Sequence, residues 1–103
     1  LSLCAPIARA VIASGKTYCP HYLGGGVGLA ASAHLLAAVV GDGLLEVDVN
    51  DNQLRDVLAG PLLPLHGEDA VVPDAPGLGY VPDVDAIKDL RVQHSVVTAM
   101  VSG

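Results

Sequence analysis

The stretch 17–46 constrains the fold more than any other part of this sequence. It opens on a β-prone run at 17–19, reaches His21 directly after a proline, and continues into consecutive glycines at 24–26. An apolar run without charge, 27–40, follows. Apolar residues on every face of a helix indicate that the helix is buried, and a short apolar run before it is consistent with a strand. The order therefore predicts a strand, a loop and a buried helix rather than a membrane span.

A second apolar run at 44–47 follows the helix and carries Glu46 where the strand gives way to a loop. Two parallel strands bridged by a helix form a βαβ unit, and such units place their chemistry at the carboxyl ends of the strands. We therefore predict that the strands near 17–19 and 44–47 are parallel, with a helix at about 28–40 between them. His21 and Glu46 are then expected at the same end of the sheet.

The residues alone leave the roles of these two side chains open. His21 is as readily an ordinary strand-end histidine as a group that takes or returns a proton near neutral pH. Glu46 is either a buried carboxylate that needs a partner or a solvated strand end.

The composition favours a parallel sheet or barrel. Hydrophobic residues make up 51% of the chain, yet there are three Tyr and no Phe or Trp, so the core must be built from Leu, Val, Ile and Ala. Such a core suits the layered interior of a parallel sheet or barrel. The apolar fraction is high for a chain of 103 residues, and we expect part of this surface to face a larger body.

The net charge of −6 removes the electrostatic basis for binding nucleic acid or an anionic membrane, so neither is expected as a partner. The cysteines, Cys4 and Cys19, lie in no CxxC or CxxH pattern, which predicts neither a zinc site nor a disulfide framework. We expect both to be reduced, buried thiols.

The rest of the chain is predicted to form short elements and loops. In order, these are a helix at 5–14, a polar loop that caps a short helix ending near Leu58, a hairpin turn at 66–69, an irregular loop at 73–79, and a helix from Asp83 to about Leu90. The tail 92–103 carries no clear structural signal.

Several residues of catalytic type are better explained structurally. His34, on the apolar helix, is expected to be a satisfied structural histidine, and His66 and His94 are expected to be exposed. Glycines 24–26 lack the spacing of a phosphate-binding loop and are expected to pack closely near the site. An acidic cluster is expected to form a solvated loop and helix cap rather than a cation site; its members are Asp48, Asp51 and Asp56.

Three segments resemble a known family: PHYLGGGVGLAASAHLLAAV, LLEVDVN and VVPDAPGLGYVPD. As an ordered set, over about 5–90, they resemble the C-terminal portion of the mandelate racemase/muconate lactonizing enzyme family of the enolase superfamily. The resemblance implies an α/β fold class. Residues 1–60 would be the C-terminal portion of a modified TIM (β/α) barrel, about strands 7 and 8 with their helices. Residues 61–103 would be the C-terminal segment that returns to the capping domain.

By this resemblance, the chain comes from an enzyme that abstracts the proton α to a carboxylate and stabilises the enolate on Mg²⁺. His21 is similar to the general base that ends the seventh strand in the mandelate racemase-like branch. Glu46 is similar to the carboxyl group that hydrogen-bonds the substrate carboxylate. The family's three carboxylate ligands of Mg²⁺, and the Asp that pairs with the His, lie on strands three to six, which this chain lacks. No metal ligand is therefore expected here.

The function implied is that of the C-terminal fragment of a cytoplasmic, Mg-dependent acid-sugar dehydratase, with a small sugar acid as substrate. Two alternatives stay open: a racemase or epimerase of a 2-hydroxy acid, and a non-catalytic fragment that only associates with other chains. The expected partners are the remainder of the barrel, the capping domain and further copies in a homo-oligomer. The chain alone is expected to be inactive, because a general base without its metal leaves the enolate unstabilised.

Overall fold

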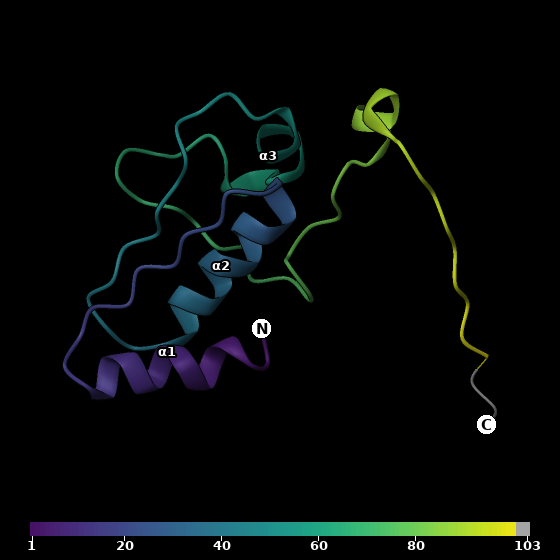
Figure 1. The fold of residues 1–103 in the computed structure, drawn as a ribbon. Coiled ribbons are helices and arrows are strands. Elements are labelled where there is room, and N and C mark those ends of the chain that lie inside the picture. The colour runs from purple at the N-terminus through teal and green to yellow at the C-terminus, as the bar shows by residue number, and fades with distance from the viewer. Residues whose placement is uncertain (101–103) are drawn as a thin grey trace.

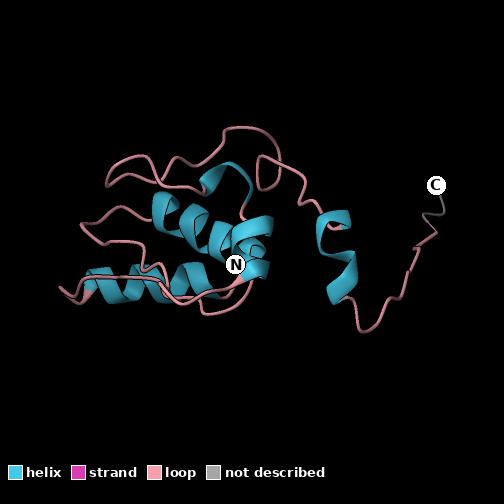
Figure 2. Ribbon diagram, turned by 90° about the horizontal axis from the view of Figure 1, so that it is seen from above, coloured by secondary structure: helices cyan, strands magenta, loops and turns pink. Residues whose placement is uncertain are grey.

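The computed structural model describes residues 1–100, which form a helical body with a C-terminal extension (Figure 1). Its helices are α1 (Cys4–Ala13), α2 (Gly26–Ala38), α3 (Gln53–Leu58) and the 3₁₀ helices η1 (Gly60–Leu62) and η2 (Asp85–Leu90). The other described residues form loops, turns and isolated β-bridges, and no regular strand is assigned within 1–100 (Figure 2).

Helix α2 lies in the middle of the body and carries the first of two cores. Leu29, Ala30 and Ala33 on α2 are buried against Ala59 and Leu62. Partly buried side chains from the rest of the chain complete this core: Leu45, Val47, Leu63, Ala70, Val72, Leu78 and Tyr80. Burial of this apolar surface holds the segment around 44–47 and the chain after α3 against α2.

A glycine brings α2 and α3 into close contact. A Cβ on Gly26 would overlap backbone atoms of Arg55, Leu58 and Ala59. Because no side chain separates the two backbones, the start of α2 sits directly on α3. The sequence prediction that the glycine cluster packs closely is confirmed at this position.

Helix α1 packs against the C-terminal end of α2 and forms the second core, which contains Ala8, Leu35 and Val39 (Figure 1). Tyr18 packs on the edge of this core. Burial of the phenol, with a smaller electrostatic contribution from the nearby Cys4 side chain, raises the pKa of Tyr18 above its usual value of 10.0.

The helix positions agree closely with the sequence predictions. The burial of the apolar helix is less complete than predicted. The helix predicted at about 28–40 is α2, and the one predicted at 5–14 is α1. Val27, Ala37 and Ala38 of α2 are exposed, so the prediction that this helix is packed on all faces is wrong for the described residues. The chain supplies neighbours for only part of the circumference of α2, and the remaining apolar surface stays open to solvent.

The strands predicted near 17–19 and 44–47 are replaced by two extended segments that lie side by side. The segments are parallel, as predicted, but their pairing is a single isolated bridge between His21 and Glu46. Pro20 has no N–H to donate to a ladder. Each segment also has a partner on one side only, and a lone two-stranded pair is marginally stable. The prediction of regular strands is therefore wrong within residues 1–100.

The chain after α3 confirms most of the predicted short elements. The turn at 66–69 is closed by an antiparallel bridge between His66 and Asp69. The Tyr80 hydroxyl donates to the Leu58 carbonyl at 2.7 Å, and Asp83 Oδ1 accepts from the Ala86 N–H at 3.2 Å just before η2. Residues 92–100 extend away from the body (Figure 1). The last three residues of the predicted segment 61–103 lie outside the described part of the chain.

Within residues 1–100, every helix is too short or too polar to cross a bilayer.

Candidate active site

His21 and Glu46 lie next to each other at one end of the two parallel segments. The Glu46 N–H donates to the Pro20 carbonyl at 3.1 Å, which fixes the register of the pair. His21 Nδ1 lies 3.6 Å from Glu46 Oε2. The proximity that the βαβ argument predicts is therefore observed, while the catalytic roles of the two residues remain predictions.

Side chains alternate between the two faces of these segments, as extended backbone requires. The side chains of one face are exposed; they are Thr17, Cys19, His21, Leu44 and Glu46. The side chains of the other face are partly or fully buried; they are Tyr18, Pro20, Leu45 and Val47. Both candidate residues thus stand on one open face, while the opposite face packs on the helices.

The separation of His21 and Glu46 leaves both side chains free to act on a third group. A distance of 3.6 Å is longer than a hydrogen bond, although it allows an ion pair when the imidazole is protonated. The side chains are 45% and 55% exposed, respectively. A neutral imidazole here can accept a proton from a substrate on the open face, and a protonated carboxyl group can donate a hydrogen bond to it.

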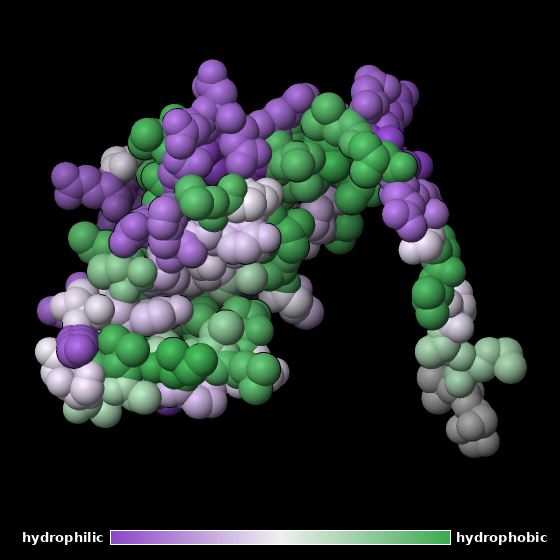
Figure 3. Space-filling model, in the orientation of Figure 1, coloured by the Kyte–Doolittle hydropathy of each residue, from purple (hydrophilic) through white to green (hydrophobic). Residues whose placement is uncertain are grey.

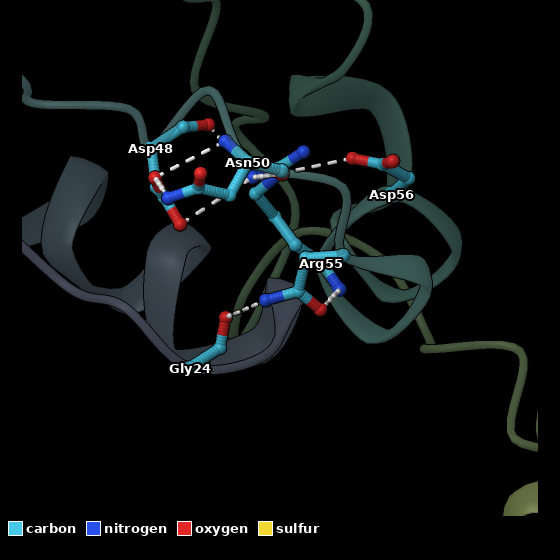
Figure 4. Close-up of polar contacts among 6 residues, drawn as sticks. Gly24, Asp48, Asn50, Arg55 and Asp56 are labelled. Carbon is cyan, nitrogen blue, oxygen red and sulfur yellow. Dashed lines mark hydrogen bonds and ion pairs between the residues drawn. The ribbon is translucent and has the colours of Figure 1, made fainter.

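The loop after Glu46 is held by Arg55, the buried charged side chain of the described chain (Figure 4). Arg55 Nη1 donates to the carbonyl oxygens of Asp48 at 2.7 Å and Asn50 at 2.9 Å. Its Nε donates to Asp56 Oδ1 at 2.9 Å. With only 8% of its surface exposed, Arg55 fixes the shape of the backbone that leaves Glu46.

Asn52 connects the loop after His21 to the start of α3. Its Oδ1 accepts from the Arg55 N–H at 3.0 Å, and this hydrogen bond makes Asn52 the N-cap of α3. Its Nδ2 donates to the Gly24 carbonyl at 3.2 Å. The polar loop therefore caps the short helix, as predicted, and the capping residue also reaches across to the glycine cluster (Figure 4).

Two members of the acidic cluster, Asp48 and Asp56, are engaged by protein groups. Asp48 Oδ1 accepts from Asn50 Nδ2 at 2.7 Å, and Asp48 Oδ2 lies 4.0 Å from Arg55 Nη1. Asp56 is paired with the same guanidinium. Residues 1–100 contain no group of three or more His, Cys, Asp or Glu side chains that could hold a metal ion.

The remaining histidines lie as predicted. His34 Nε2 is 3.0 Å from the Leu78 carbonyl oxygen, so this histidine ties α2 to the loop at 73–79. His66 and His94 are exposed.

The predicted burial of the cysteines is wrong. Cys4 and Cys19 are free thiols, and both are exposed. Cys19 belongs to the open face of the parallel segments, and Cys4 lies in the first turn of α1 beside the exposed Leu3. The Leu44 N–H donates to Cys19 Sγ at 3.5 Å, and this contact leaves Cys19 exposed.

Arg55 and the second bond of Asn52 were not predicted from the sequence. The available signal was a single arginine three residues after the Asp- and Asn-rich stretch 48–52, in a chain with five Lys and Arg in total. Such an arginine is usually a solvated partner of the acids, and the sequence pattern does not reveal its burial.

A histidine and a carboxylate lie at one end of adjacent parallel segments that are backed by a helix, an arrangement compatible with an acid–base site at the carboxyl ends of (β/α) barrel strands. Residues 1–86 match the family described as enolase C-terminal domain-like. The chain belongs to this family, which makes it a mandelate racemase/muconate lactonizing enzyme-like C-terminal part within the enolase superfamily. The fold is therefore related to the TIM barrel.

A curated relative with a named activity also matches. The chain is 36% identical over 66 residues to an arabinonate dehydratase of Saccharolobus solfataricus. The match covers 64% of this chain and 17% of that relative, so this chain spans only a small part of the relative's length. No solved structure matches this chain.

Proposed function

We propose that this chain is the C-terminal part of a sugar-acid dehydratase that begins its reaction by removing the proton α to the substrate carboxylate. The observation that carries the proposal is the 3.6 Å approach of His21 Nδ1 to Glu46 Oε2 on one open face. The family match and the resemblance to an enzyme named for dehydrating arabinonate support the same reaction class.

In this proposal, His21 is the general base. Its neutral imidazole takes the proton from the α-carbon, and the electron pair of the C–H bond moves into the enolate. The protonated His21 then gives this proton to the β-hydroxyl group, which leaves as water, and the resulting enol converts to a 2-keto-3-deoxy acid. The Glu46 carboxyl group shares a hydrogen bond with the substrate carboxylate, and this bond strengthens in the transition state as negative charge builds up there.

Mg²⁺ is the cofactor expected from the resemblance, but the described residues do not fit it. Arg55 occupies the space between the Asp48 and Asp56 carboxylates, and no other cluster of ligands lies within residues 1–100. We therefore place the metal ligands on other parts of the complete barrel.

The complete enzyme is proposed to contain the remaining barrel strands and the capping domain, with residues 1–60 as barrel and 61–103 as the segment that returns to the cap. The open face of the parallel segments would then point into the barrel, and further copies would form a homo-oligomer. A racemase or epimerase would use the same first step, but the name of the matched relative favours dehydration.

The test is a screen of the complete protein against a library of sugar acids, with formation of the 2-keto-3-deoxy acid as readout. We expect at least one acid, arabinonate among the candidates, to be dehydrated, and His21→Asn to abolish the activity. His94→Asn, at an exposed histidine of the tail, is the matched control and should retain full activity. Absence of product with every acid, or full activity of His21→Asn, would rule out the proposal.

A further inference from the structure

The backbones that follow His21 and Glu46 are both bound to helix α3. The Gly24 carbonyl, three residues after His21, accepts from Asn52 Nδ2 at 3.2 Å. The Asp48 carbonyl, two residues after Glu46, accepts from Arg55 Nη1 at 2.7 Å. Asn52, the N-cap of α3, and Arg55, within α3, therefore hold the backbone that follows each of the two candidate catalytic residues.

The burial of Arg55 makes its contacts specific. A buried guanidinium is costly unless its donors are satisfied, and here they meet two carbonyl oxygens and one carboxylate within 2.9 Å. These acceptors belong to Asp48, Asn50 and Asp56. The planar fork of arginine reaches them together, whereas a lysine ammonium on a single stem cannot reproduce this geometry.

Asn52 joins the two halves of this arrangement. Its Oδ1 accepts from the Arg55 backbone N–H at 3.0 Å, while its Nδ2 reaches the Gly24 carbonyl. The chain of contacts runs from the backbone after His21, through Asn52 and Arg55, to the backbone after Glu46. Figure 4 labels Gly24, Arg55 and Asp48 along this path. A shift of either residue would break one of these hydrogen bonds or move the backbone that follows His21 or Glu46.

We propose that Asn52 and Arg55 are positioning residues that set the separation and orientation of His21 and Glu46. The inference rests on the proposed function for its catalytic consequence. Neither residue lies on the open face, and each acts through backbone carbonyl groups. Displacement of a base by about 1 Å can slow a reaction by about a hundredfold. Hydrogen bonds that hold the backbone next to His21 and Glu46 are therefore expected to affect the turnover rate.

Two variants of the complete protein test the positioning role of Asn52 and Arg55. Asn52→Asp keeps an acceptor that caps α3 but loses the donor to Gly24, and Arg55→Lys keeps the charge but loses the fork. We expect kcat to fall by about ten- to a hundredfold in each, with a much smaller change in KM. Arg9→Lys, at an exposed arginine of α1, is the matched control and should leave both constants unchanged.

Amide hydrogen exchange supplies a readout that does not depend on activity. The Glu46 N–H, which donates to the Pro20 carbonyl, should exchange about tenfold faster in both variants than in the unaltered protein. The Val39 N–H, which donates to the Leu35 carbonyl at 3.2 Å at the far end of α2, is the internal reference and should be unaffected.

Together, the two measurements distinguish the positioning role of Asn52 and Arg55 from the proposed dehydratase activity. Faster exchange at Glu46 alone, with reduced kcat, supports the proposal. Unchanged exchange at Glu46, or equal acceleration at Val39, overturns it, because the residues would then have no local role or only a general structural one. If the unaltered protein dehydrates no sugar acid, the proposed function fails, and the exchange comparison still decides whether Asn52 and Arg55 hold the two segments.

Discussion

At the scale of single residues, the Tyr80 hydroxyl offers a direct test of how the C-terminal segment is held. Its O–H donates to the Leu58 carbonyl at 2.7 Å, and the ring lies against Gly60. Tyr80→Phe should lower the free energy of unfolding of the complete protein by about 1 kcal/mol, measured by urea denaturation. Tyr22→Phe is the matched control, because no hydrogen bond of that hydroxyl is found among residues 1–100. An equal loss in both variants would contradict this account.

The same hydroxyl predicts a pH dependence. Burial raises the pKa of Tyr80 above its usual value of 10.0. The folded protein therefore keeps this proton at a pH where the unfolded chain releases it. The stability that this group contributes is fully present below about pH 10 and is lost as the pH rises toward the folded pKa. The difference in unfolding free energy between the parent and Tyr80→Phe should shrink above pH 10. A difference that grows above pH 10 would contradict the predicted loss of stability.

Residue patterns predicted the proximity of His21 and Glu46 better than they predicted the contacts that hold the surrounding backbone. His21 and Glu46 were predicted to lie close together because each stands at the end of a run expected to be a strand. Functional groups gather at the carboxyl ends of parallel strands. The burial of Arg55 was not predicted, because a single arginine beside acidic residues is usually solvated. The sequence does not show that the loop after Glu46 folds over its side chain. The exposure of Cys19 was missed because alternation decides which side chains share a face but not whether anything covers that face.

At the scale of elements, the contact of α2 with α3 depends on Gly26. A Cβ there would meet backbone atoms of Arg55, Leu58 and Ala59, and backbone cannot move aside as a flexible side chain does. Gly26→Ala should therefore destabilise the complete protein by about 1–3 kcal/mol, read as a lower midpoint of thermal unfolding. Gly41→Ala, whose Cβ would meet only the flexible tip of Ile12, should change stability by less than about 0.5 kcal/mol. Equal midpoints for both variants would show that the helices are not in close contact.

Helices were easier to predict than strands for a physical reason. The backbone of α1 and α2 is satisfied within each helix, so their limits follow from local sequence to within two residues. The segments near 17–21 and 44–47 need partners on both sides to become strands, and the chain gives each only one. The parallel direction was still predictable, because a helix between two extended segments brings the second back beside the first.

At the scale of the whole molecule, the chain leaves much apolar surface uncovered (Figure 3). Its radius of gyration is 15.7 Å, against about 13 Å for a compact domain of this length. Large exposed side chains occur along the whole described chain; they include Leu3, Ile7, Val40, Leu44, Val49, Val81 and Val97. Surface of this kind is usually covered by other protein.

The isolated 103-residue chain should therefore associate with itself and show no dehydratase activity. Light scattering coupled to size-exclusion chromatography, run over a range of concentrations, measures the first property. We expect a mass well above 10.4 kDa that rises with concentration. A stable monomer with cooperative unfolding, or sugar-acid dehydration by the isolated chain, would show that this sequence needs no larger body.

The central claim, that His21 removes a proton from carbon, is tested most directly by release of tritium into water from a sugar acid labelled at its α-carbon. This readout reports C–H cleavage whether dehydration or racemisation follows. The complete protein should release the label, and His21→Asn should slow release by at least about a hundredfold, the usual range for a lost general base. His94→Asn should match the unaltered protein. Release by His21→Asn at the unaltered rate would contradict the account, because the proton would then be leaving to another group.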